Sequence, residues 1–241
     1  MAEHLTEEEQ VESLKRWWNE NWLSIVLPIV LALGGYGGWN AWQNHQVGQA
    51  QAASDQYQAL TRAAETQPGI AMSAEQQETV GGLAETLIAD HDGTLYADMA
   101  KLMLARVLVE SKELEAAQGY LQQVSSEGAN ASMQQLAKAR LARVLSAKGE
   151  TEKALSLVAQ AQDESYQALF AEVRGDIYLS QGKAPAANTA YSAALELLPP
   201  SEFNRRSLIQ LKLDSVALPE EIVPTGTDLA PEIEAAVEGD V

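Results

Sequence analysis

The feature that most constrains this chain is a long uncharged stretch near its N-terminus. No charged residue occurs between Glu20 and Asp55, and residues 22–42 are mostly apolar. As a helix these residues rise about 31 Å, close to the roughly 30 Å thickness of the hydrocarbon core of a bilayer. The sequence therefore predicts a transmembrane helix over residues 22–42. Tryptophans, which favour the headgroup level, flank it at both ends: Trp17, Trp18, Trp22, Trp39 and Trp42.

Basic residues near the span predict its orientation. Lys15 and Arg16 precede it, and no Lys or Arg follows until Arg62, so residues 1–21 are expected in the cytosol and the rest of the chain outside it. A cleaved signal peptide is the alternative, with Ala32-Leu33-Gly34 as its cleavage site. The long acidic segment before the span and the return of apolar residues at 39–42 favour an uncleaved anchor.

Small residues in the span could form a packing face. Gly34 and Gly38 have GxxxG spacing and Ala41 lies one turn further on, which would let a partner helix approach closely, although glycine is also simply common in membrane helices. Ahead of the span, Thr6 and Glu9 form a capping-box pattern. This pattern predicts a short amphipathic helix or a lead-in turn.

The remainder of the chain shows helical periodicity without strand-like alternation. A first helix is predicted from Val47 to a break near Pro68-Gly69. A second helix is predicted to start at a cap of Ser73 with Gln76 and to close at Asp92-Gly93.

Three later segments resemble one another at tetratricopeptide positions. The first contains Leu104, Ala105, Leu108, Leu114, Ala117, Leu121 and Val124; the second contains Leu141, Ala142, Leu145, Gly149, Ala154, Val158 and Ala161; the third contains Gly175, Tyr178, Gly182, Ala187, Tyr191, Ala194 and Pro199. Small residues are needed where paired helices cross closely, and glycine supplies the turn conformation at Gly149 and Gly182. A generic bundle with recurring Ala and Leu is the alternative, which the register of the third segment disfavours.

These patterns predict an all-α chain in which a transmembrane helix precedes a tetratricopeptide-type solenoid over residues 47–214. One more helix, opened by Ser201 and carrying Leu208, Leu211 and Leu213, is expected to cap the array. Residues 215–241 are acidic and proline-containing, which is typical of a disordered tail.

Composition excludes several functions. The net charge of −18 argues against nucleic acid as a partner. The chain has no cysteine, and its three histidines, His4, His45 and His91, lie far apart, so no metal, cofactor or enzymatic activity is expected.

The chain resembles the YfgM family, the tetratricopeptide-like ancillary subunits of the bacterial Sec translocon. The resemblance covers about residues 10–213 and rests on three groups of motifs. They are Gln10-Val11-Glu12, Leu14-Lys15, Trp17-Trp18 and Glu20-Asn21 before the span; Gly38-Trp39, Trp42 and His45-Gln46 at its far end; and Leu141-Ala142-Arg143-Val144 and Arg174-Gly175-Asp176 in the repeats. It implies a single-pass protein of the bacterial inner membrane with a periplasmic body. Its implied partners are the Sec channel, a membrane-anchored periplasmic chaperone and exported clients.

The first helix of each tetratricopeptide pair lines the concave side of the array, which predicts the partner-binding residues. They are Met99, Leu102, Arg106 and Val109, then Leu136, Ala139, Arg143 and Ser146, then Leu169, Glu172, Asp176 and Leu179. Core positions and ordinary surface ion pairs are the alternative. The predicted function is an anchored interaction scaffold at the Sec translocon. An adaptor for another envelope assembly, such as cytochrome maturation, fits the same fold.

Overall fold

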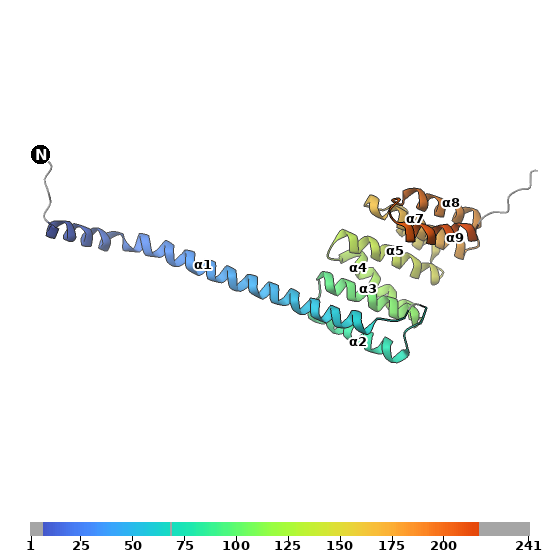
Figure 1. The fold of residues 1–241 in the computed structure, drawn as a ribbon, viewed down its shortest axis with the longest axis horizontal. Coiled ribbons are helices and arrows are strands. Elements are labelled where there is room, and N and C mark those ends of the chain that lie inside the picture. Colours follow the sequence, from blue (N-terminus) through green and yellow to red (C-terminus); the bar gives the residue numbers. More distant parts are fainter. Residues whose placement is uncertain (1–6, 68, 217–241) are drawn as a thin grey trace, which may run out of the picture. The chain divides into compact units, whose positions relative to one another are not determined.

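The computed structural model describes residues 7–67 and 69–216. Every regular element in these two ranges is helical, so the all-α fold class is confirmed (Figure 1). Thr6 of the predicted capping box and the predicted tail from residue 217 onward lie outside the described residues.

The first helix, α1, is uninterrupted through Glu7–Ala63, with Pro28 inside it. The predicted lead-in, span and helix from Val47 are thus parts of one helix, because residues 43–46 contain neither glycine nor proline that would break it. Of the described helices, only this one is long and apolar enough to cross a membrane, over Glu9–Ala63, and its most apolar stretch is not buried by the rest of the chain.

The last turns of α1 form a helix pair with α2 (Ala74–Asp90), and α3 (Leu95–Glu110) packs against both helices. As predicted, Ser73 caps α2: its Oγ accepts a hydrogen bond from the backbone N–H of Gln76 at 3.2 Å. The end of α1 is therefore the first helix of the folded body. The shared core consists of Ala53, Leu60, Met72, Val80, Ala84, Leu87, Ala100, Leu104 and Val107.

Three helix pairs follow one design: α3 with α4 (Leu114–Glu127), α5 (Ala131–Ala147) with α6 (Thr151–Leu157), and α7 (Gln167–Ser180) with α8 (Ala184–Leu197). The turn in each pair contains one left-handed residue, with φ of 85° at Gly149, 70° at Gly182 and 65° at Lys112. The next residue donates its N–H to a carbonyl five positions back, at 2.8 Å, 2.9 Å and 2.7 Å respectively. The predicted glycine turns are confirmed, and a lysine fills the equivalent place in the first repeat.

The second repeat departs from the prediction in its second helix. The helix α6 ends at Leu157, so Ala161 lies outside it, contrary to the expected register. The two carbonyl groups that follow this end have a hydrogen-bond donor outside α6. Nη1 of Arg174 donates hydrogen bonds to the Val158 carbonyl at 2.7 Å and to the Ala159 carbonyl at 3.3 Å, which satisfies acceptors without further helix.

The chain divides into two compact units, Met1–Leu157 and Val158–Val241. The second unit contains a 3₁₀ turn (Glu164–Tyr166), α7, α8 and α9 (Phe203–Ser215). Gly175 lies against the ring of Tyr191, where a Cβ atom would overlap three ring carbons, so the predicted close crossing in this repeat is confirmed.

The cap helix α9 differs in detail from its prediction. It begins at Phe203 with Glu202 at the capping position, not at Ser201. Ile209 is its buried residue, whereas Leu208 and Leu211 are exposed. Its buried side joins a core of Ala168, Ala171, Ala187, Tyr191, Ala194, Leu198 and Val216.

Candidate partner-binding groove

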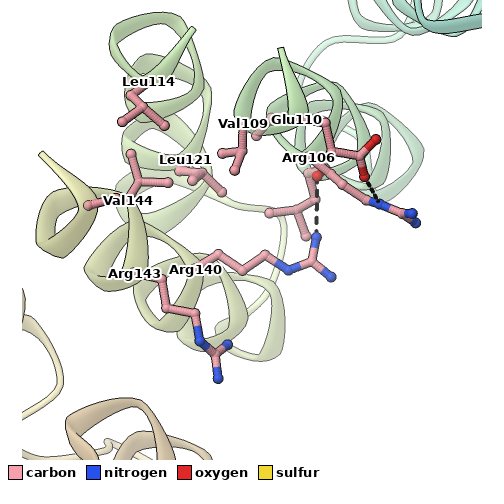
Figure 2. Close-up of a pocket in the computed structure, with 11 residues that line it drawn as sticks. Arg106, Val109, Glu110, Leu114, Leu121, Arg140, Arg143 and Val144 are labelled. Carbon is pink, nitrogen blue, oxygen red and sulfur yellow. Dashed lines mark hydrogen bonds and ion pairs between the residues drawn. The ribbon is translucent and has the colours of Figure 1, made fainter. Parts of the chain in front are cut away.

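An apolar hollow of about 350 Å³ lies between α3, α4 and α5 in the first unit. Its floor includes the buried side chains of Leu102, Leu121 and Val144. Figure 2 shows apolar side chains, among them Val109 and Leu114, on one side of the hollow and arginine side chains on the other. The full lining is Leu102, Ala105, Arg106, Val109, Glu110, Leu114, Leu121, Arg140, Arg143, Val144 and Ala147.

A second hollow of about 200 Å³ continues from the first, because Leu102, Arg106 and Arg140 line both. It extends along α3 and α5 toward Tyr57 of α1, and its other lining residues are Met99, Met103, Met133 and Leu136. Methionine is unbranched and polarizable, and therefore adapts to differently shaped apolar side chains. We call the two hollows together the α3–α5 groove.

Three arginines give the groove a positive wall. Nη1 of Arg140 donates a hydrogen bond to the Leu102 carbonyl at 3.2 Å, which ties α5 to α3 (Figure 2). Nε of Arg106 pairs with Oε1 of Glu110 at 2.9 Å. Burial lowers the pKa of Arg140, and the like charges of Arg143 and Arg106 lower it further. Positive charge is thus concentrated beside an apolar floor.

The structure brings together six of the predicted partner-binding residues. Met99, Leu102, Arg106, Val109 and Arg143 all line the groove, as does Leu136. Ala139, also predicted to face the concave side, is fully buried.

Sequence reasoning missed Arg140, Tyr57, Met103 and Met133. One signal for Arg140 was present, because it precedes Arg143 by three residues and therefore shares a helix face with it. Tyr57 could not be found from the three aligned segments, because it precedes all of them in the chain.

The predicted residues of the third repeat have a different environment in the second unit. Glu172 is buried, and its carboxylate pairs with Lys212 at 2.7 Å and Arg205 at 3.3 Å, both from α9. Asp176 pairs with Lys212 at 2.8 Å and accepts a hydrogen bond from the Tyr191 hydroxyl at 3.0 Å. The helix α9 thus occupies this acidic pair, while Leu169 is partly buried and Leu179 is exposed.

The predicted membrane packing face lies on the exposed part of α1. No atom of another element lies within 4 Å of a Cβ built on Gly34 or Gly38, and Ala41 is likewise exposed. Packing of another helix against these residues stays a prediction.

Comparison with known proteins identifies the family. The tetratricopeptide repeat-like domain family matches residues 15–218, which is most of the chain. The chain is 31% identical over 191 residues to a protein of Escherichia coli strain K12, covering 79% of this chain and 87% of that protein. The E. coli protein is named "Ancillary SecYEG translocon subunit". This chain belongs to the same family, and the predicted resemblance to YfgM is confirmed.

Relatives in other bacteria carry the same name. The protein from Aggregatibacter actinomycetemcomitans is 29% identical over 216 residues, which cover 90% of this chain and all of the relative. The relative from Haemophilus influenzae is 29% identical over 194 residues, covering 80% of this chain and 91% of its own. No solved structure matches the chain. The family match begins at residue 15 and therefore includes most of α1 as well as the helical repeats.

Proposed function

We propose that this protein is a membrane-anchored interaction scaffold ancillary to the Sec translocon, and that it connects the channel to a membrane-anchored periplasmic chaperone. The observation that carries the proposal is the match to ancillary SecYEG translocon subunits over nearly the whole chain. This match favours the translocon over cytochrome maturation or another envelope assembly as the site of action. Polypeptides emerging from the channel are the natural clients of such a scaffold.

The long helix supports the membrane part of the proposal. Residues 22–42 of α1 cross the inner membrane with residues 1–21 in the cytosol, as Lys15 and Arg16 favour, and the helical body lies in the periplasm. Because α1 continues without a break into the core around Leu60, the body is joined to the span by helix and not by a flexible linker.

The groove supports the interaction part. Tetratricopeptide arrays bind partners on surfaces lined by the first helix of each pair, and here α3 and α5 provide an apolar hollow with basic residues. We propose that Arg106 and Arg143, together with Met99, Leu102 and Val109, contact a partner there. Gly34, Gly38 and Ala41 of the span provide a second contact, with a transmembrane helix of the channel or the chaperone.

Photocrosslinking in intact membranes tests this function. A photoreactive residue at Val109, which is exposed in the groove, is expected to crosslink to a channel subunit or to the chaperone. The same residue at Leu208, exposed on α9, is the matched control for surface exposure. In copurification, the Arg106→Ala/Arg143→Ala variant is expected to recover less of a partner at equal expression. Absence of every Sec component from crosslinks at all positions of α1 and the body would refute the proposal.

A further inference from the structure

We infer that the α3–α5 groove binds a polypeptide segment of a partner protein in which carboxylate side chains alternate with large apolar ones. This inference rests on the proposed function and specifies the chemistry of the occupant. It derives from the joining of an apolar, methionine-bearing floor to a wall of three arginines.

The apolar part of the inference follows from the lining. The larger hollow holds about 350 Å³, enough for a large aliphatic or aromatic side chain, and the smaller one about 200 Å³. Because the two share Leu102, Arg106 and Arg140, an occupying segment can place one apolar side chain in each hollow. Met99, Met103 and Met133 line the smaller hollow, so it can accept apolar side chains of several shapes.

The charged part follows from the position of Arg140. Its guanidinium lies where the hollows meet, is held by the Leu102 carbonyl, and has Arg143 and Arg106 as like-charged neighbours. A carboxylate bound there would relieve this repulsion and accept charge-assisted hydrogen bonds from a preorganised donor. The lining contains three arginines and one glutamate, in a chain whose net charge is −18. A basic segment would meet repulsion at this wall, whereas an acidic segment is attracted to it.

Fluorescence anisotropy with the full-length chain in detergent micelles tests the inference. The probes are three fluorescein-labelled peptides of equal length. One alternates Glu with Leu, one alternates Lys with Leu, and one alternates Glu with Ser. We expect the Glu/Leu peptide to bind at least about tenfold more tightly than either of the others, with an affinity that falls as salt rises. Equal affinity for the Lys/Leu peptide would overturn the inference.

Variants locate the binding site. Arg140→Gln and Arg143→Gln are each expected to weaken Glu/Leu binding by about tenfold, as is typical when one charge-assisted contact at an interface is lost. Arg62→Gln removes an exposed arginine outside the groove lining and should leave affinity unchanged. Since Arg140 also joins α5 to α3, Arg143→Gln decides the matter if Arg140→Gln alters the circular dichroism spectrum. Unchanged binding in a folded Arg143→Gln variant would overturn the proposed site.

A truncated chain tests whether the C-terminal segment of this protein is itself the occupant of the groove. Residues 217–241 are themselves acidic and contain Ile, Val and Leu. If the Glu/Leu peptide binds only to a chain truncated after Val216, the chain's own C-terminal segment is the occupant and a partner segment is not.

The peptide-binding assay contains no translocon, so its result is independent of the crosslinking test. Failure of peptide binding therefore leaves the crosslinking result intact, and absence of Sec crosslinks leaves peptide binding intact.

Discussion

Lys112 holds a backbone conformation that glycine holds in the two other repeats. Its φ is 65°, against 85° at Gly149 and 70° at Gly182, and all three residues occupy the same place in the helix-pair turn. A Cβ atom in this left-handed region costs about 1 kcal/mol. We therefore expect Lys112→Gly to raise the free energy of unfolding by about 0.5 to 1 kcal/mol.

Urea unfolding of the full-length chain in micelles, followed by far-ultraviolet circular dichroism, measures this change. Tryptophan fluorescence is unsuitable, because all five tryptophans lie in α1. The matched control is Gly149→Ala, which introduces a Cβ at φ 85° and should lower stability by a similar amount. Destabilisation by Lys112→Gly would contradict the proposed strain.

Gly175 offers the opposite test, since space and not backbone conformation requires glycine there. A Cβ at this position would overlap the ring of Tyr191, which is fully buried. We expect Gly175→Ala to cost about 1 to 3 kcal/mol and Gly175→Leu more, although both residues favour helix over glycine. Urea unfolding followed by far-ultraviolet circular dichroism measures the change in the free energy of unfolding for both variants.

Gly119 in α4 is the control for Gly175, because a Cβ there meets no atom within 4 Å. Gly119→Ala should stabilise the chain by up to about 1 kcal/mol through helix propensity alone. If Gly175→Ala stabilised the chain as Gly119→Ala is expected to, the close contact between Gly175 and the Tyr191 ring would not be what requires glycine there.

At the scale of elements, α9 does more than shield the end of the array. Lys212 lies between Glu172 and Asp176 of α7, at 2.7 Å and 2.8 Å, and the side chain of Glu172 is only 7% exposed. Removing the cation leaves a nearly buried carboxylate with Arg205 as its remaining α9 partner. We expect Lys212→Met to destabilise the second unit by about 1 to 3 kcal/mol, a cost typical of a buried charge deprived of a partner.

Thermal unfolding of the full-length chain checks this, with Lys183→Met as the control for an exposed lysine of the same unit. Adding Glu172→Gln to Lys212→Met should recover part of the loss, because the buried charge is then absent as well. A stability equal to that of the control variant would mean that α9 is held by its apolar contacts alone.

Sequence periodicity predicted the repeated elements well, because each depends on local signals. Ser73 caps α2 through its own side chain, and Gly149 and Gly182 mark turns that few other residues adopt. The early end of α6 was not predicted, and the carbonyls of Val158 and Ala159 that follow it accept hydrogen bonds from Arg174, a residue distant in sequence. The groove was predicted only in part, because some of its lining residues meet only through tertiary packing. Residues of one helix face, such as Arg106, follow from spacing, whereas the contribution of Tyr57 requires tertiary packing.

At the scale of the whole molecule, α1 sets the distance between the predicted membrane span and the folded body. The residues between the predicted span and the first core residue, Ala53, are exposed and helical. Residues 43–52 would therefore place the body about 15 Å from the edge of the hydrocarbon core, at the rise of an α-helix. The groove begins at Tyr57, one turn beyond Ala53. In the proposed topology a polypeptide leaving the channel meets the groove close to the membrane.

Cysteine labelling tests that topology directly, because the natural chain contains no cysteine. Glu12→Cys and His45→Cys place single thiols on exposed parts of α1, on either side of the predicted span. In intact spheroplasts, a membrane-impermeant maleimide should label the His45→Cys chain and spare the Glu12→Cys chain, which should become reactive after permeabilisation. Both chains should stay in the membrane pellet after carbonate washing, with intact masses that include α1. Labelling of Glu12→Cys before permeabilisation would reverse the orientation. A soluble chain that begins near Gly35 would replace the anchor with a cleaved signal peptide, and the groove would then no longer be tethered beside the channel.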